Sequence, residues 1–76
     1  MPSKDLTSLY DAKVGKEYII SQLPQEAVLM SFGFRTGQTL YKKRAYRLGG
    51  PVVIESDTST IALGKDIAKK ILVVGG

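Results

Sequence analysis

The sequence predicts a mainly β domain, a small barrel of about five strands, with a short helix after the first strand and a helical turn before the last. Apolar and β-branched residues gather in runs of about four to eight positions, which is the length of a strand. Glycine or proline separates most of these runs. The chain has 76 residues, which suits one domain. A closed barrel is preferred at this length because closure removes exposed sheet edges.

The strands are predicted from the runs in which apolar residues alternate or cluster. They are expected at Glu17–Ile20, Gln38–Ala45, Val52–Ser56, Thr60–Leu63 and Ile71–Val74. Alternation points one set of strand side chains toward the core. These are Leu40, Val52 and Ile54, whereas Tyr18 and Ile20 are expected only to share one face of their strand. Residues 1–5 and 75–76 are expected to fray at the two ends of the single domain, which spans residues 1–76.

Two helical segments are expected between these strands. Gln25–Phe32 should form about two turns and end at Gly33, because glycine enters the left-handed conformation at no steric cost. Gly64–Lys70 should form about one turn, with a favourable charge pair between Asp66 and Lys70. Apolar spacing predicts the buried face of the first helix. It comprises Val28, Leu29 and Phe32.

Composition excludes several function classes. The chain has no histidine and no cysteine, so the usual general acid–base and nucleophilic residues are missing and no enzyme activity is expected. The glycine spacing Gly33-x-x-x-Gly37 lacks the following Lys-Ser/Thr of a phosphate-binding loop and is interpreted as a helix stop and a turn. The seven carboxylates are scattered, and only Glu55 and Asp57 lie close in sequence. No metal or cofactor is therefore expected.

No signal peptide and no bilayer-length apolar run is evident, so a cytoplasmic location is expected. The net charge of +4 is compatible with an acidic partner or a membrane surface, and is too small to indicate nucleic acid by itself.

The order and spacing of the apolar and glycine positions resemble the FeoA family, ferrous iron transport protein A. The matching pattern covers about Leu6 to Val74. It runs Leu9, Gly15, Ile20, Val28 to Phe32, Gly33-Phe34-x-x-Gly37, Leu40, Gly49-x-Pro51-Val52-x-Ile54, Ala62-Leu63, Ala68 and Ile71-x-Val73. The resemblance implies an SH3-like barrel. It also implies a cytoplasmic accessory protein that binds and modulates FeoB, the ferrous iron permease with a GTP-hydrolysing domain.

Two surface features suggest where a partner would bind. Apolar residues crowd the short helix, and a basic run follows at Lys42 to Arg47. An apolar centre with a charged rim is typical of a protein interface. The predicted contact surface comprises Met30, Phe34, Lys42, Lys43, Arg44, Tyr46 and Arg47. We expect the ammonium of Lys42 to reach water while its stem is buried.

Other interpretations of these features stay open. The basic run is also typical of a solvated strand end, and Phe34 of a residue that caps the barrel. Anionic lipid headgroups would attract the same cations, and the domain could lie close to a membrane. Tyr41 and Tyr46 would offer stacking faces to nucleic acid, although no nucleic acid is expected as a partner. An adaptor unrelated to iron would need its tyrosines side by side in a groove.

Overall fold

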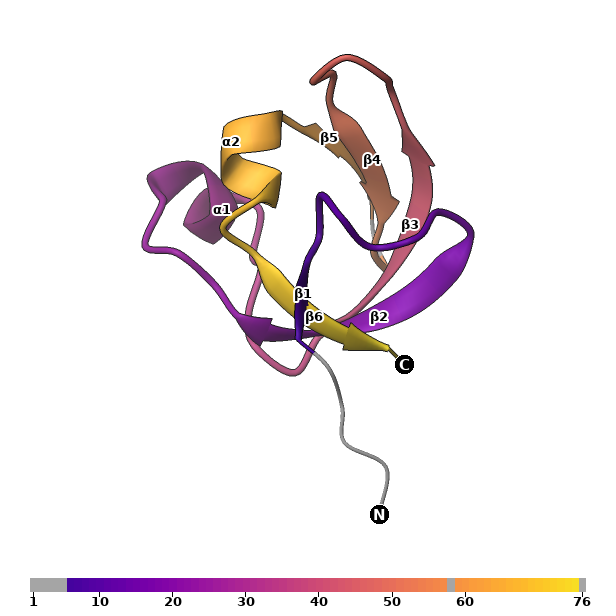
Figure 1. Cartoon of the computed structure of the whole chain (residues 1–76). Coiled ribbons are helices and arrows are strands. Elements are labelled where there is room, and N and C mark those ends of the chain that lie inside the picture. The colour runs from indigo at the N-terminus through magenta and orange to yellow at the C-terminus, as the bar shows by residue number, and fades with distance from the viewer. Residues whose placement is uncertain (1–5, 58, 76) are drawn as a thin grey trace.

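The computed structural model describes residues 6–57 and 59–75, and the protein in this part of the chain is a single curled sheet with two short helices (Figure 1). The strands are β1 (Thr7–Ser8), β2 (Lys16–Gln22), β3 (Thr39–Ala45), β4 (Val52–Glu55), β5 (Thr60–Leu63) and β6 (Leu72–Gly75). The helices are α1 (Ala27–Ser31) and α2 (Lys65–Ala68). The mainly β class and the placement of both helical segments are confirmed.

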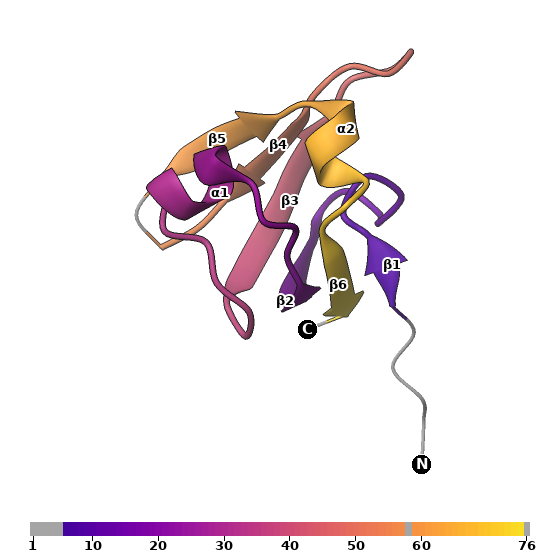
Figure 2. The same cartoon turned by 90° about the vertical axis from the view of Figure 1, so that its left-hand side faces the viewer.

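The sheet has the strand order β1-β6-β2-β3-β4-β5, and all of its pairings are antiparallel. β1 and β5 are its two edges, so the hydrogen-bonded ladder does not close within the described residues, contrary to the expectation of a closed barrel. Both edge strands are short, and α2 connects β5 to β6 on the open side (Figures 1 and 2). The sheet therefore curls around its core without a final strand pair.

One strand and one chain end differ from the prediction. β1, with only two residues, was not predicted because so short a polar segment carries no periodic signal. Gly75 pairs with Tyr18 as the end of β6 instead of fraying. The expected fraying of residues 1–5 and 76, and the turn at Thr58, lie outside the described residues.

The core is formed by the inward side chains of the strands, by one residue from each helix and by four residues of the connecting segments, Leu9, Ala12, Phe34 and Ile71. The inward positions expected from alternation are all buried. The full core comprises Leu9, Ala12, Tyr18, Ile20, Leu29, Phe34, Leu40, Val52, Ile54, Leu63, Ala68, Ile71 and Val73. Phe34 is 8% exposed, which agrees with a cap on the core and not with a place on the partner surface.

The helix α1 is shorter than expected and buries a different face. It contains five residues, and only Leu29 is buried, so the predicted burial of Val28 and Phe32 is wrong. Gly33 adopts a φ of 78° just beyond the helix, and the amide of Phe34 donates to the carbonyl of Leu29 at 3.1 Å. This is the expected glycine stop. It turns the chain inward, so that Phe34 packs in the core and Phe32 stays outside.

A salt bridge also differs from the expected pairing near α2. Lys70 pairs with Glu26, just before α1, at 3.2 Å instead of with Asp66. The pair links segments that are distant in sequence, which local helix spacing could not predict.

Candidate interaction surfaces

Apolar side chains of α1 form the first candidate surface. Val28, Met30 and Phe32 are 38%, 74% and 54% exposed, respectively, and we call these three residues the α1 apolar surface. Leu29 alone anchors the helix in the core, and a helix of five residues is too short to bury apolar groups on several sides. Exposed apolar groups gathered on one element are typical of a docking surface. At about 100° per residue, Val28 and Phe32 share one flank of the helix and Met30 lies on the other. Sequence reasoning placed Met30 on the contact surface but placed Val28 and Phe32 inside.

The predicted basic run, Lys42 to Arg47, lies partly in the interior and partly on the surface. Lys42 is 1% exposed, so its ammonium does not reach water and the expected rim position is wrong. Lys43 lies on the opposite face of β3 and pairs with Glu55 of β4 at 3.2 Å. Arg44, Tyr46 and Arg47 are exposed. Simple alternation would turn Arg44 inward with Lys42, but the β3–β4 register shifts between these two residues and releases Arg44 to solvent.

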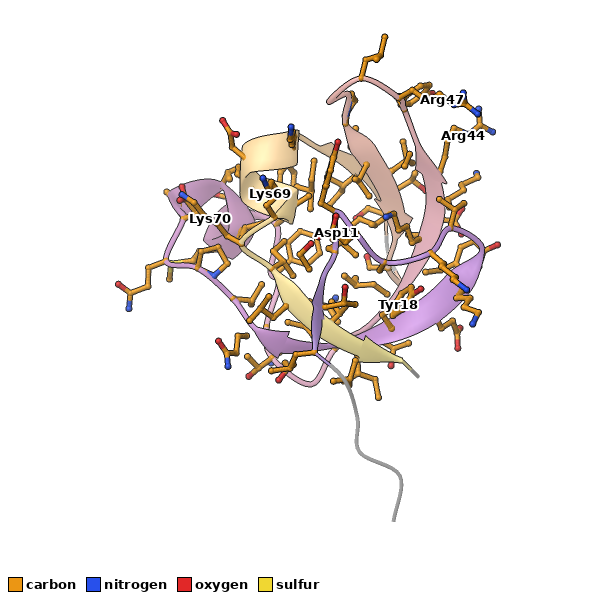
Figure 3. The ribbon with its side chains drawn as sticks, in the orientation of Figure 1. Asp11, Tyr18, Arg44, Arg47, Lys69 and Lys70 are labelled. Atoms are coloured by element: carbon orange, nitrogen blue, oxygen red, sulfur yellow. The ribbon has the colours of Figure 1, made fainter. Side chains whose placement is uncertain are left out.

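The two parts of the predicted contact surface are separated in space. The loop between β3 and β4 extends from the sheet on the side away from α1, as both views show (Figures 1 and 2). Arg44 and Arg47 lie together at this end, whereas Lys70 lies on the side of α1 (Figure 3). Met30 and the exposed arginines therefore belong to two different surfaces. With Phe34 and Lys42 buried, the single mixed interface expected from sequence proximity is not formed.

Lys42 has a structural site of its own in the interior. Its ammonium donates hydrogen bonds to the carbonyl oxygen of Tyr10, at 2.9 Å, and to that of Ala12. These carbonyls belong to the segment between β1 and β2, which the hydroxyl of Tyr18 also holds by donating to the Lys13 carbonyl at 2.8 Å. Lys42 thus ties the N-terminal segment to the middle of the sheet. Lysine is usually exposed, so sequence reasoning did not predict this buried role.

Burial sets the protonation behaviour of Lys42. Loss of solvation lowers the pKa of its ammonium from the ordinary 10.5, and the Asp11 carboxylate partly opposes this effect. An uncharged amine keeps two protons, so it can still donate to both carbonyls. The hydrogen bonds therefore do not require the charge.

This lowered pKa predicts a pH-dependent stability. Between the folded-state pKa and 10.5, the unfolded chain binds more protons at Lys42 than the folded chain does. The free energy of unfolding therefore rises as pH increases through that interval, and the gain is complete above 10.5. We expect the stability advantage of wild type over Lys42→Met, measured by urea unfolding, to grow as pH rises from neutrality toward that value. A constant or shrinking difference would contradict the prediction.

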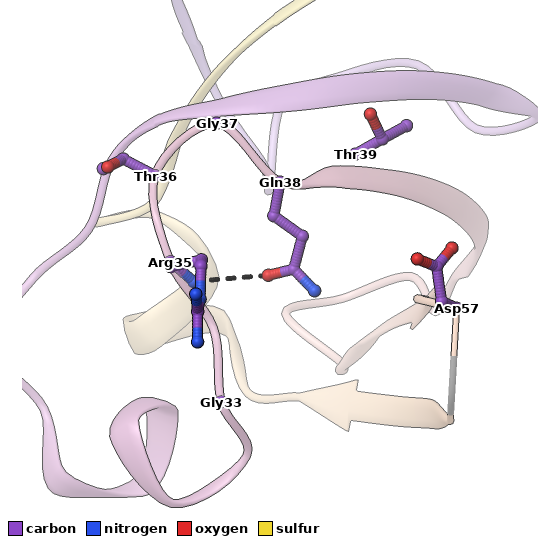
Figure 4. Close-up of a pocket in the computed structure, with 7 residues that line it drawn as sticks. All are labelled: Gly33, Arg35, Thr36, Gly37, Gln38, Thr39 and Asp57. Atoms are coloured by element: carbon purple, nitrogen blue, oxygen red, sulfur yellow. Dashed lines mark hydrogen bonds between the residues drawn. The ribbon is translucent and has the colours of Figure 1, made fainter.

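A polar pocket of about 500 Å³ opens between the segment after α1 and the turn after β4 (Figure 4). The lining residues are Gly33, Arg35, Thr36, Gly37, Gln38, Thr39 and Asp57. The Arg35 amide donates to the Gln38 side chain at 3.3 Å, and the Gly37 amide donates to the Ile20 carbonyl at 2.8 Å. Because these two amides already have partners within the protein, they are not free to cradle a phosphate. Gly33 and Gly37 act as a helix stop and a turn, as expected.

The described residues contain no group of three or more His, Cys, Asp or Glu side chains that could hold a metal ion. Glu55 forms its ion pair with Lys43. In the described part of the chain, no helix is long and apolar enough to cross a membrane.

The four tyrosines do not line one groove. Tyr18 is 6% exposed and belongs to the core, and Tyr10 packs against the core. Tyr41 and Tyr46 are 36% and 50% exposed on β3 and just beyond it. Burial of Tyr18 therefore removes one aromatic residue from the groove that a proline-rich ligand would need.

Several solved structures share this fold. The "Manganese-dependent transcriptional repressor" is 18% identical, with a TM-score of 0.86 over 100% of this chain and 45% of that one. The chain thus spans less than half the length of that repressor. An "Iron Uptake Regulatory Protein (FeoA)" is 22% identical, with a TM-score of 0.81 over 92% of this chain and 96% of that one. Iron(II) transport protein A from Clostridium thermocellum is 25% identical, with a TM-score of 0.80 over 91% of this chain and 45% of that one.

A comparison with curated protein sequences finds no match. The model of the FeoA domain matches residues 7–74, which is nearly the whole chain. These residues include all six strands except the last residue of β6, and both helices. The SH3-like fold of the solved FeoA structures is the fold seen here. The chain therefore belongs to the FeoA domain family, a family of small non-catalytic domains associated with ferrous iron transport.

Proposed function

We propose that this protein is a cytoplasmic, non-enzymatic accessory protein of ferrous iron uptake that binds and modulates the iron permease FeoB. The FeoA domain match over residues 7–74 carries this proposal. The chemistry of the chain supports it, because a protein without histidine or cysteine is poorly equipped to carry ferrous iron itself. Its role would then be to present a shaped surface to the permease.

We assign the main contact with the permease to the α1 apolar surface. Three exposed apolar side chains lie on this one helix. They suit the centre of a protein interface, because that centre is depleted in charged residues. Met30 remains from the surface predicted by sequence, whereas Phe34 and Lys42 leave it because they are buried. The salt bridge between Lys70 and Glu26 lies beside α1 and would form part of a polar rim.

A pull-down with the cytoplasmic domain of the permease tests this proposal. We expect Met30→Glu combined with Phe32→Glu to weaken binding at least tenfold, because a contact would have to desolvate two carboxylates. Both side chains are exposed, so the folded domain should tolerate the change. Lys43→Glu with Arg44→Glu serves as the comparison, because these residues lie on the other surface. Equal binding by wild type and the α1 variant would disprove the assignment to α1, and absence of binding by wild type would disprove the proposed partner.

A further inference from the structure

The tip of the β3–β4 hairpin combines features that neither the fold nor α1 explains. We define the hairpin tip as Tyr46, Arg47 and Leu48. Leu48 is fully exposed, at 104% of its reference area, and adopts a φ of 61°. It is the only non-glycine residue with positive φ in the described part of the chain. Leucine is poorly suited both to that backbone conformation and to full exposure in water.

The hairpin tip is a defined structure and not a frayed loop. The amide of Tyr46 donates to the Pro51 carbonyl at 3.1 Å, and the amide of Gly50 donates to the Arg47 carbonyl at 3.3 Å. A Cβ added at Gly50 would come within 2.7 Å of the Tyr46 Cβ, so the chain packs closely behind the tip. These contacts hold Leu48 outward at the end of the hairpin.

Cations lie at the same end of the molecule as this exposed leucine. Arg44 and Arg47 lie together at the same end of the molecule (Figure 3), and neither takes part in the two salt bridges of the described residues. Lys65 adds a third cation, because its Cδ lies 3.6 Å from the position that a Cβ on Gly49 would occupy. No carboxylate occurs from Lys42 to Pro51. Asp66 on α2 is the sequence neighbour of Lys65 and the only acid in that short helix.

From this arrangement we propose that the hairpin tip binds an anionic lipid surface. Leu48 enters the boundary between headgroups and acyl chains, Tyr46 lies at headgroup level, and the cations contact lipid phosphates. Charge complementarity requires an anionic partner. A single protruding leucine with cations nearby suits shallow insertion into lipid better than burial against a flat protein surface. The contact would be independent of the permease contact assigned to α1.

The expected binding is weak and additive. Each cation near an anionic membrane surface contributes about fivefold to partitioning, so three cations contribute about a hundredfold. One leucine adds a smaller factor because only part of its side chain would enter the acyl region. Such binding would be reversible and sensitive to salt. It would become significant when a second contact holds the protein near the membrane.

Vesicle sedimentation tests the proposal on the intact chain. We expect binding to phosphatidylcholine vesicles that contain phosphatidylserine, little binding to phosphatidylcholine alone, and loss of binding at high salt. Arg44→Glu with Arg47→Glu should reduce binding at least 25-fold, the product of about fivefold for each arginine. Arg35→Glu with Lys69→Glu changes the net charge equally, away from the hairpin tip, and should have a much smaller effect.

Two variants of Leu48 separate insertion from simple charge attraction. Leu48→Gly suits the positive φ, so it should fold at least as stably as wild type and yet bind anionic vesicles severalfold less well. The chain has no tryptophan, so Leu48→Trp gives a single reporter whose emission should shift to the blue on anionic vesicles. Phe32→Trp on α1 should show no shift. Equal vesicle binding by the arginine pair and the control pair would overturn the proposal. So would an unchanged vesicle affinity of Leu48→Gly, or the absence of binding by wild type to vesicles that contain phosphatidylserine.

Discussion

Lys42→Ala is expected to lower the free energy of unfolding by about 3 kcal/mol or more. The substitution removes a long buried stem, and it leaves the carbonyls of Tyr10 and Ala12 without the amine that donates to them. Small domains have total stabilities toward the lower end of about 5–15 kcal/mol. The variant should therefore keep only a small part of its stability and unfold at a much lower urea concentration than wild type, although a lysine is conventionally a replaceable surface residue.

Urea denaturation of the purified variant measures this effect, and Lys43→Ala provides the matched control. Lys43 is the next residue in the same strand, but its side chain is exposed and its partner Glu55 is also accessible. An exposed pair of this kind contributes at most about 1 kcal/mol. Similar losses for the two variants would show that the buried position of Lys42 has no special role.

Leu29→Ala is expected to destabilise the protein by about 2–5 kcal/mol and to release α1 from the core. Leu29 is the only buried residue of this five-residue helix, and the helix has no side-chain cap at Glu26. So short a helix has little stability of its own and depends on packing. Because α1 carries the proposed permease contact, the same substitution should also weaken permease binding.

Urea denaturation measures the loss of overall stability in Leu29→Ala, and hydrogen exchange measures the release of α1 from the core. The amides of Met30 and Phe34, which donate to the carbonyls of Glu26 and Leu29 at the two ends of the helix, should lose protection first. Met30→Ala is the control, because it alters the adjacent exposed side chain and should change stability by less than about 0.5 kcal/mol. If Leu29→Ala and Met30→Ala were equally stable, the anchoring role of Leu29 would be wrong.

Local sequence patterns predicted most of the framework and little of the surface. Alternation placed Leu40 and Ile54 in the core, and Gly33 marked the end of α1, because these patterns depend only on backbone geometry and apolar burial. Alternation also assigned Lys42 to the inner face of its strand. It could not predict the two carbonyls whose hydrogen bonds offset the cost of burying the amine. Those acceptors come from a segment about thirty residues earlier.

The candidate surfaces depended even more on distant contacts. Met30 and Arg44 were expected to adjoin because they are close in sequence, but the hairpin carries the arginine to the end of the sheet away from α1 (Figures 1 and 3). A shift of register after Lys42 changed the exposure of Arg44, and such a shift leaves no reliable mark in a single sequence. The α1 apolar surface depends on tertiary packing, which buries Leu29 and leaves Val28, Met30 and Phe32 exposed.

The sequence by itself determined the mainly β class, the positions of the longer strands and helices, and the resemblance to a family, since each rests on the order and spacing of residues along the chain. Only the tertiary structure decided that Lys42 is internal, that Phe34 and Phe32 lie on opposite sides of the boundary between core and solvent, and that the apolar and basic surfaces are separate. The physical reason is that burial and proximity depend on which distant segments pack together, and local periodicity contains no information about that choice.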